Sequence, residues 1–369
     1  MGPLKGLKIV EMAGIGPGPF CGMVLADLGA EVIRVDRASA LGGGTREEPA
    51  NRGKKSIAVD LKSPEGVEVV LKLVENSDAI FEGFRPGVME RLGLGPDICQ
   101  NRNKKLVYGR MTGWGQDGPL ANAAGHDINY LALSGMLSLL GKEGSPPEPP
   151  INLLADYGSG TMFAVISGIL GIYEVKNNQK ENPVYDVAMF EGVSYLGSLM
   201  FGLKDAGMWG DKRGTNLLDG GAPFYRCYET KDSKYIAIGA LESKFFKELI
   251  ETLDLPLEMI EEQMMFDKWS AHVETFSKVF LSKSRDEWSN IFLNTDCCVT
   301  PVLTLDEARK HPHAVSRDSY LDSFPRGNNM IKEKSDQQII KNINEIFEEL
   351  NISKNFIEEL EKNGTLSIE

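Results

Sequence analysis

Histidine and cysteine are scarce in this chain, with four and five residues among 369. The cysteines show neither a disulfide framework nor the spacing of a metal site, which favours a reducing, intracellular compartment. The longest apolar run, 161–173, has 13 residues, whereas a membrane-spanning helix needs about 20. We therefore expect no metal and no membrane partner, and an intracellular location that leaves peroxisome, mitochondrion and cytoplasm open.

The chain also has no excess of basic residues. The net charge is −13, which argues against nucleic acid or an anionic membrane as a partner. Residues 1–125 nevertheless hold 16 Lys and Arg against 15 Asp and Glu, so the rest of the chain carries the negative excess. A small anionic ligand would therefore belong with the N-terminal part.

Strands and helices alternate over the first third of the chain. The expected strands are 7–13, 30–36, 55–61, 78–84 and 105–113, with helices over 21–29, 63–77 and 87–93 between them. Ser63 is the expected N-cap of the second helix, although Gly66 stands where a capping box would have Glu or Gln. This alternation predicts an α/β fold with a Rossmann-like, mostly parallel sheet covered by helices.

The remainder of the chain predicts a second domain. A long apolar helix over 154–175 contains four glycines, which suggests close packing against a neighbour. Residues 225–243 read as an antiparallel hairpin, and 244–310 are mainly helical. We expect a large α/β domain over 1–205, a smaller α+β domain over 206–315, and a segment over 316–369 that returns to the large domain.

The glycine-rich turn after the first strand does not fit a dinucleotide-binding fingerprint. Neither Gly14 nor Gly16 starts a G-x-G-x-x-G pattern, and Pro17 and Pro19 remove two N–H donors that a pyrophosphate would need. Asp36 lies at the end of the next strand, where a dinucleotide-binding fold has its ribose-binding acid, but Arg37 follows it directly. The better interpretation is a tight strand-to-helix turn.

Basic residues gather near the ends of the expected strands. They are Arg37, Arg46, Arg52, Lys54, Lys55, Lys62, Arg85 and Arg91. In an open α/β sheet, ligands bind beyond the carboxyl ends of the strands, and arginine grips phosphate oxygens with paired hydrogen bonds. These residues therefore indicate either a polyphosphate site or a solvated charged rim.

Three further residues could carry chemistry. His126, in "AGHDINY", fits a structural histidine, a surface histidine or a general base. Asp156, in "NLLADYGSG", fits an N-cap, or a carboxylate beside backbone N–H groups that could stabilise an oxyanion. Glu242, in "IAIGALES", fits a helix cap or a partner that orients an imidazole. None of the three decides the function alone.

Taken together, these segments resemble the family III CoA-transferase superfamily, and within it the branch that racemises branched acyl-CoA thioesters. They appear in family order between residue 4 and about residue 305, which is about four fifths of the chain. The carrying motifs are "GPGPFCGMVLADLGAEVIRVDR", "KKSIAVDLK", "FRPGVMERLGLGP", "AGHDINYLALSG", "NLLADYGSG", "LLDGGAPFY", "IAIGALES" and "TDCCVTPVLT". After about residue 320 the chain is shorter than is usual for the family.

The resemblance implies an isomerase that inverts the 2-methyl centre of acyl-CoA thioesters of fatty-acid metabolism. His126 and Asp156 would stand on opposite faces of the α-carbon, one removing its proton and the other returning a proton, with an enolate between them. Glu242 would pair with the histidine. No metal, flavin or pyridoxal cofactor is implied, since CoA is part of the substrate.

The resemblance also implies a binding site and an assembly. The residues expected to hold the CoA nucleotide and pyrophosphate are Arg37, Val59, Asp60, Leu61, Lys62, Arg85 and Arg91; those expected to line the thioester end are Gly125, Asp127, Ile128, Asn129 and Tyr130. Two chains would interlock as a homodimer, with Glu242 reaching His126 from the partner subunit.

The alternative within the superfamily is CoA transfer. Those enzymes use an aspartate at the position of Asp156 as a nucleophile that forms an aspartyl-CoA thioester. They commonly have an aromatic residue where this chain has His126. The presence of both His126 and Glu242 favours the racemase.

Overall fold

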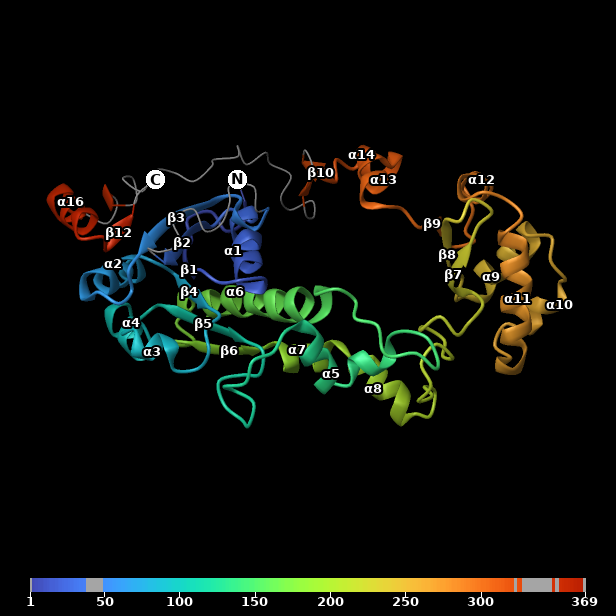
Figure 1. The fold of residues 1–369 in the computed structure, drawn as a ribbon, viewed down its shortest axis with the longest axis horizontal. Coiled ribbons are helices and arrows are strands. Elements are labelled where there is room, and N and C mark those ends of the chain that lie inside the picture. Colours follow the sequence, from blue (N-terminus) through green and yellow to red (C-terminus); the bar gives the residue numbers. More distant parts are fainter. Residues whose placement is uncertain (1, 38–48, 322–323, 327–346, 349–351, 368–369) are drawn as a thin grey trace. The chain divides into compact units, whose positions relative to one another are not determined.

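The computed structural model describes residues 2–37, 49–321, 324–326, 347–348 and 352–367 (Figure 1). The chain divides into two compact units. The first comprises Met1–Ser134, Pro150–Leu196 and Phe324–Glu369, and the second comprises Gly135–Pro149 and Gly197–Ser323. The sequence had suggested a first boundary at 205. Residues 135–149 lie with the second unit, where Arg213 donates to the Ser145 carbonyl and Lys212 pairs with Glu143.

The first unit is built on a seven-stranded sheet (Figure 1). In spatial order its strands are β12 (Leu366–Ser367), β3 (Lys54–Val59), β2 (Glu31–Arg37), β1 (Lys8–Met12), β4 (Ala79–Glu82), β5 (Val107–Thr112) and β6 (Val184–Ala188). Strands β1 to β6 are parallel, and β12 runs antiparallel to β3. The expected mostly parallel sheet is confirmed, and β6 and β12 add strands that the sequence pattern did not indicate.

Helices of the first unit connect and cover these strands. They are α1 (Pro17–Asp27), η2 (Pro49–Asn51), α2 (Pro64–Glu75), α3 (Val88–Arg91), α4 (Pro96–Arg102), α5 (Asp127–Leu133), the π-helix η4 (Leu153–Thr161), α6 (Met162–Lys176), α7 (Met189–Leu196) and α16 (Lys354–Lys362). Helix α1 begins four residues before the expected start, since Pro17 is well tolerated at the first helical position.

Helix α6 packs closely against the sheet. A Cβ added at Gly168 would lie 2.4 Å from the Phe81 ring, and one at Gly171 would lie 2.7 Å from Val107 and Tyr185. The packing role expected for these glycines is therefore confirmed. Among the described residues, the continuous helix Leu153–Lys176 is also the one stretch long and apolar enough to cross a membrane, but in this structure it packs on β5.

The start of α2 explains why Gly66 occupies a capping-box position. The Ser63 hydroxyl accepts the Gly66 N–H at 2.9 Å, so the expected N-cap is confirmed. A Cβ at Gly66 would lie 2.2 Å from the Asp60 carbonyl oxygen and 2.9 Å from the Val59 side chain. Any larger residue would therefore displace the chain that follows β3.

We expect Gly66→Ala to lower the free energy of unfolding of the first unit by about 1–3 kcal/mol, because backbone atoms must shift to admit the methyl group. The matched control is Gly202→Ala in α8 (Ser198–Asp205), where nothing lies within 4 Å of the added Cβ and where alanine favours the helix. Urea unfolding of both variants checks the difference. Equal stability of the two would contradict the steric account.

The second unit combines a three-stranded antiparallel sheet with helices. Its strands are β7 (Tyr225–Glu229), β8 (Tyr235–Gly239) and β9 (Val299–Pro301). Its helices are η3 (Met136–Leu139), α8, α9 (Ser243–Thr252), α10 (Glu258–Glu261), η5 (Phe266–Lys268), α11 (Trp269–Phe280), α12 (Arg285–Ile291), α13 (Leu305–Lys310) and α14 (Pro312–Ser316). The chain continues through short strands β10 (Tyr320–Leu321) and β11 (Phe324–Pro325). The expected hairpin is confirmed as β7–β8.

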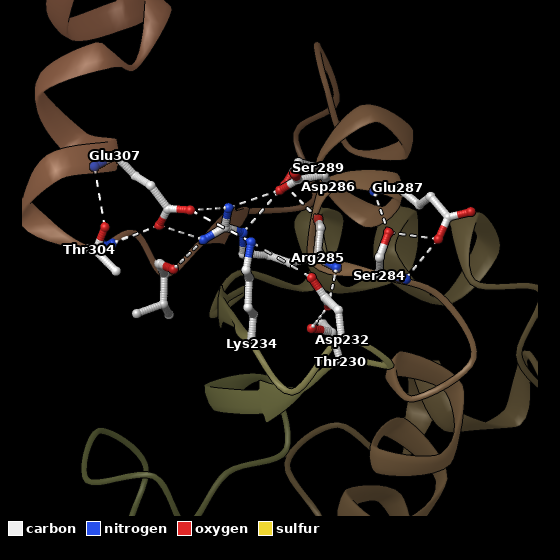
Figure 2. A network of polar contacts seen from close by, with 11 residues as sticks. Thr230, Asp232, Lys234, Ser284, Arg285, Asp286, Glu287, Ser289, Thr304 and Glu307 are labelled. Atoms are coloured by element: carbon white, nitrogen blue, oxygen red, sulfur yellow. Dashed lines mark hydrogen bonds and ion pairs between the residues drawn. The ribbon is translucent and has the colours of Figure 1, made fainter.

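A polar network fastens α13 within the second unit (Figure 2). The buried Arg285 guanidinium donates to both carboxylate oxygens of Glu307 at 2.8 Å and to the Val302 carbonyl at 3.1 Å. These bonds hold the pKa of Glu307 far below its usual range. Thr304 and Glu307 also form a capping box at the start of α13. The network is structural and anchors the chain after β9.

Candidate active site

His126 is the N-cap of α5 and its side chain is exposed. Its backbone N–H donates to the Asn129 Oδ1 at 3.0 Å, and its carbonyl accepts from the Asn129 N–H at 2.8 Å. The short helix therefore fixes the backbone while the imidazole stays open to solvent. A core histidine is excluded, and the surface and general-base interpretations remain.

Asp156 is the fourth residue of the π-helix η4. Its carboxylate is half-buried, and Asn152 Nδ2 stands 3.4 Å from Oδ2. Burial raises the pKa of Asp156, and the Asp127 charge raises it further, while the Asn152 hydrogen bond and the positive form of His126 lower it. The carboxylate and imidazole are therefore close enough to interact electrostatically.

Asp127 joins the two elements that carry these side chains. Its Oδ2 accepts the backbone N–H of Ala155 at 2.8 Å and that of Asp156 at 2.9 Å. The sequence had suggested that N–H groups beside Asp156 could stabilise an oxyanion. That interpretation is wrong for these two donors, because the Asp127 carboxylate already occupies them.

An aromatic pair supports the chain just before His126. The Tyr130 hydroxyl donates to the Gly125 carbonyl at 2.5 Å, and the Tyr130 and Trp114 rings meet edge to face at 4.8 Å. A Cβ at Gly125 would lie 2.8 Å from the Tyr130 ring. Tyr130 is buried and acts as a support, whereas Ile128 and Asn129 are exposed.

The expected CoA-binding cations lie at one edge of the sheet. Arg37 ends β2, Lys62 follows β3, and Arg85 and Arg91 follow β4; all four are exposed. Because these strands are parallel, their carboxyl ends share an edge. Arg37 is paired in register with Val59.

Other members of the expected binding segment face inward. Val59 is buried in β3 between β2 and β12, and Leu61 packs against the core, so neither apolar side chain offers a polar contact to a ligand. The Asp60 Oδ1 accepts the Lys62 N–H at 2.9 Å, which shapes the turn after β3. The segment therefore presents Lys62 as its exposed charge.

Three of the basic residues singled out by the sequence have structural partners instead. Arg52 pairs with Asp27, Lys54 with Glu11, and Lys55 with Glu31. Lys54 and Lys55 are the first residues of β3, so they lie at the opposite end of the strand from its carboxyl end. These three cations therefore form ion pairs within the fold. Arg46 lies outside the described residues.

Glu242 lies in the second unit as the N-cap of α9, and it is exposed. Its carbonyl accepts the N–H groups of Phe245 and Phe246 at 3.0 Å. Burial raises the pKa of the Cys298 thiol, and the Glu242 charge raises it further. The side chain is accessible from outside its own unit.

Sequence reasoning missed two neighbours of Asp156. Asn152 contacts the carboxylate from one helical turn earlier. Gly16 has φ +70°, and a Cβ there would lie 3.6 Å from the Asp156 Oδ2. The glycine-rich turn after β1, which does not fit a dinucleotide-binding fingerprint, therefore lies beside the Asp156 carboxylate. Among the described residues, no group of three or more His, Cys, Asp or Glu side chains could hold a metal ion.

The model of CoA-transferase family III matches residues 4–332. The chain belongs to this family. It is 46% identical to the α-methylacyl-CoA racemase of Mus musculus, over 86% of this chain and 82% of that protein. It is 44% identical to the α-methylacyl-CoA racemase of Homo sapiens, over 87% and 83%. A crystal structure of a CAIB/BAIF family protein from Brucella suis has a TM-score of 0.71 and 25% identity, over 87% and 89%.

Proposed function

We propose that this family III protein racemises the 2-methyl centre of branched-chain acyl-CoA thioesters. The observation that carries the proposal is the pair of bases, His126 and Asp156, on two elements joined by Asp127. The similarity to two α-methylacyl-CoA racemases supports the same activity. Inversion follows when one base takes the α-proton from one face and the other base delivers a proton to the opposite face.

The electrostatics suit two groups that exchange roles. A carboxylate of ordinary pKa is a poor proton donor near neutral pH, and burial, together with the Asp127 charge, raises the pKa of Asp156 above its ordinary value. Histidine is a common general acid and general base in enzymes. The enolate oxygen requires hydrogen-bond donors, and the N–H groups of Asp127 and Ile128 at the start of α5 are the candidates, since the Asn129 N–H is bonded to the His126 carbonyl.

The surroundings suit both ends of an acyl-CoA. The exposed cations at the sheet edge would hold the nucleotide and pyrophosphate. Exposed apolar side chains flank the two bases and would contact the acyl chain: Ile15, Ile128, Ile151, Leu153 and Leu154. The thioester itself acidifies the α-proton, so the proposed reaction requires no metal, flavin or pyridoxal cofactor.

The test is incubation of a single-enantiomer 2-methylacyl-CoA in deuterated water. The expected result is deuterium at the α-carbon and a product that becomes racemic, followed by NMR and chiral chromatography. Movement of CoA to a free acid without exchange, with an aspartyl thioester trapped at Asp156, would instead establish CoA transfer.

We also propose a homodimer in which Glu242 of one chain completes the site of its partner. The outer face of α6 carries Met162, Ile166, Leu170 and Tyr173 at helical spacing, and all four are exposed. Such an apolar face is a typical protein interface. His126 and Glu242 are both accessible, as pairing across an interface requires.

Hybrid dimers test this arrangement. His126→Ala and Glu242→Ala chains are each expected to be inactive alone. When the two variants are mixed in equal amounts and reassociated, half of the dimers should be hybrids. Each hybrid has one intact site of its two, so about a quarter of wild-type activity should return. If activity stays absent although hybrids are detected by mass spectrometry, Glu242 does not act across the dimer.

We propose an intracellular location, with the organelle open. All five cysteines are free thiols, and Cys227 and Cys298 are exposed. Exposed free thiols persist in a reducing compartment.

A further inference from the structure

We infer that Asp127 is a positioning residue of the reaction, which holds Asp156 in place opposite His126 and keeps a negative charge beside it. The inference rests on the proposed racemase function. It assigns to the Asp127 side chain a role other than lining the substrate, since that side chain is 4% exposed.

The connectivity is the first argument. Asp127 directly follows His126, and its Oδ2 accepts the backbone N–H groups of Ala155 and Asp156. The Asp127 carboxylate therefore links the residue that follows His126 to the backbone of Asp156, 29 residues further along the chain. Any movement of α5 relative to η4 must break these two bonds.

The bonds also account for where η4 begins. The first N–H groups of a helix lack partners within the helix, and a carboxylate at this end is favoured by both hydrogen bonding and the helix dipole. Asp127 supplies that carboxylate from outside η4. Without it, the N–H groups of Ala155 and Asp156 would be free to take a different partner, and the Asp156 side chain would move with them.

The charge is the second argument. The Asp127 Oδ1 is buried and has no hydrogen-bond partner within the part of the chain that the structure describes. Its charge is therefore poorly screened. Burial raises the pKa of Asp156, and the Asp127 charge raises it further; burial and the Asp156 charge raise the pKa of Tyr130, and the Asp127 charge adds to them. The other polar groups acting on Asp156 are Asn152 and His126, which oppose this effect.

Asp127→Asn separates charge from geometry, because asparagine keeps an acceptor oxygen for the two N–H groups and loses the charge. Removing a like charge makes ionisation of Asp156 easier and lowers its pKa. The acid limb of the pH profile of kcat/KM should therefore move to lower pH. Both directions of the reaction should share this shift, since their kcat/KM values are related by the equilibrium constant.

Asp127→Ala removes the acceptor as well. We expect kcat to fall by roughly 100-fold while KM changes by less than about threefold, because the loss misplaces a base without touching the CoA site. The asparagine variant should recover most of this kcat. The control is Asp78→Asn, which removes a carboxylate that accepts the Lys8 N–H at the amino end of β4 and should leave kcat and the pH profile unchanged.

The outcomes separate this inference from the proposed function. If the wild-type protein does not racemise its substrate, the proposed function fails first. If the wild type is active and Asp127→Asn keeps both the wild-type kcat and the wild-type acid limb, the inference is overturned. Should Asp127→Ala fail to fold, the pH profile of Asp127→Asn, measured against Asp78→Asn, still decides the question.

Discussion

The two hydrogen bonds from the N–H groups of Ala155 and Asp156 to the Asp127 carboxylate are the interaction on which the site depends. They bring η4 to α5, and so bring a carboxylate into the electrostatic range of an imidazole. Gly16 and Asn152 then close around the carboxylate. The contact thus links the helix that begins after the solvent-exposed His126 to the distant Asp156.

The parallel sheet supplies the second constraint. Strands that run in one direction end at one edge, so cations placed just after β2, β3 and β4 meet there without being near in sequence. Close-packed glycines maintain that edge, since Gly66 admits the Asp60 carbonyl and Gly168 admits the Phe81 ring. The fold thus places the exposed cations of the proposed nucleotide site, and the two proposed bases His126 and Asp156, within the same unit.

Much of this arrangement could be predicted from the sequence. Alternating apolar segments indicated the five strands β1 to β5, and Ser63 marked the start of α2. Apolar periodicity predicted a helix there but could not indicate its π-helical form around Asp156, or the hydrogen bonds of its first turn to a carboxylate 29 residues away. The return of the C-terminal segment to the large domain was expected, but the same limit hid strand β12 itself, because its antiparallel pairing with β3 involves only two residues. The sequence left Lys54 open as part of a polyphosphate site or of a solvated rim, and could not indicate its buried ion pair with Glu11 on a different strand.

The most direct test of the two-base account is exchange of the α-proton with deuterated water in His126→Asn and Asp156→Asn, measured separately for each enantiomer. Each variant should invert neither enantiomer, yet should still exchange the proton of the one whose α-proton faces the remaining base. The two variants should therefore exchange opposite enantiomers. If either variant still racemised its substrate, or if both variants exchanged the same enantiomer, His126 and Asp156 would not be the two bases.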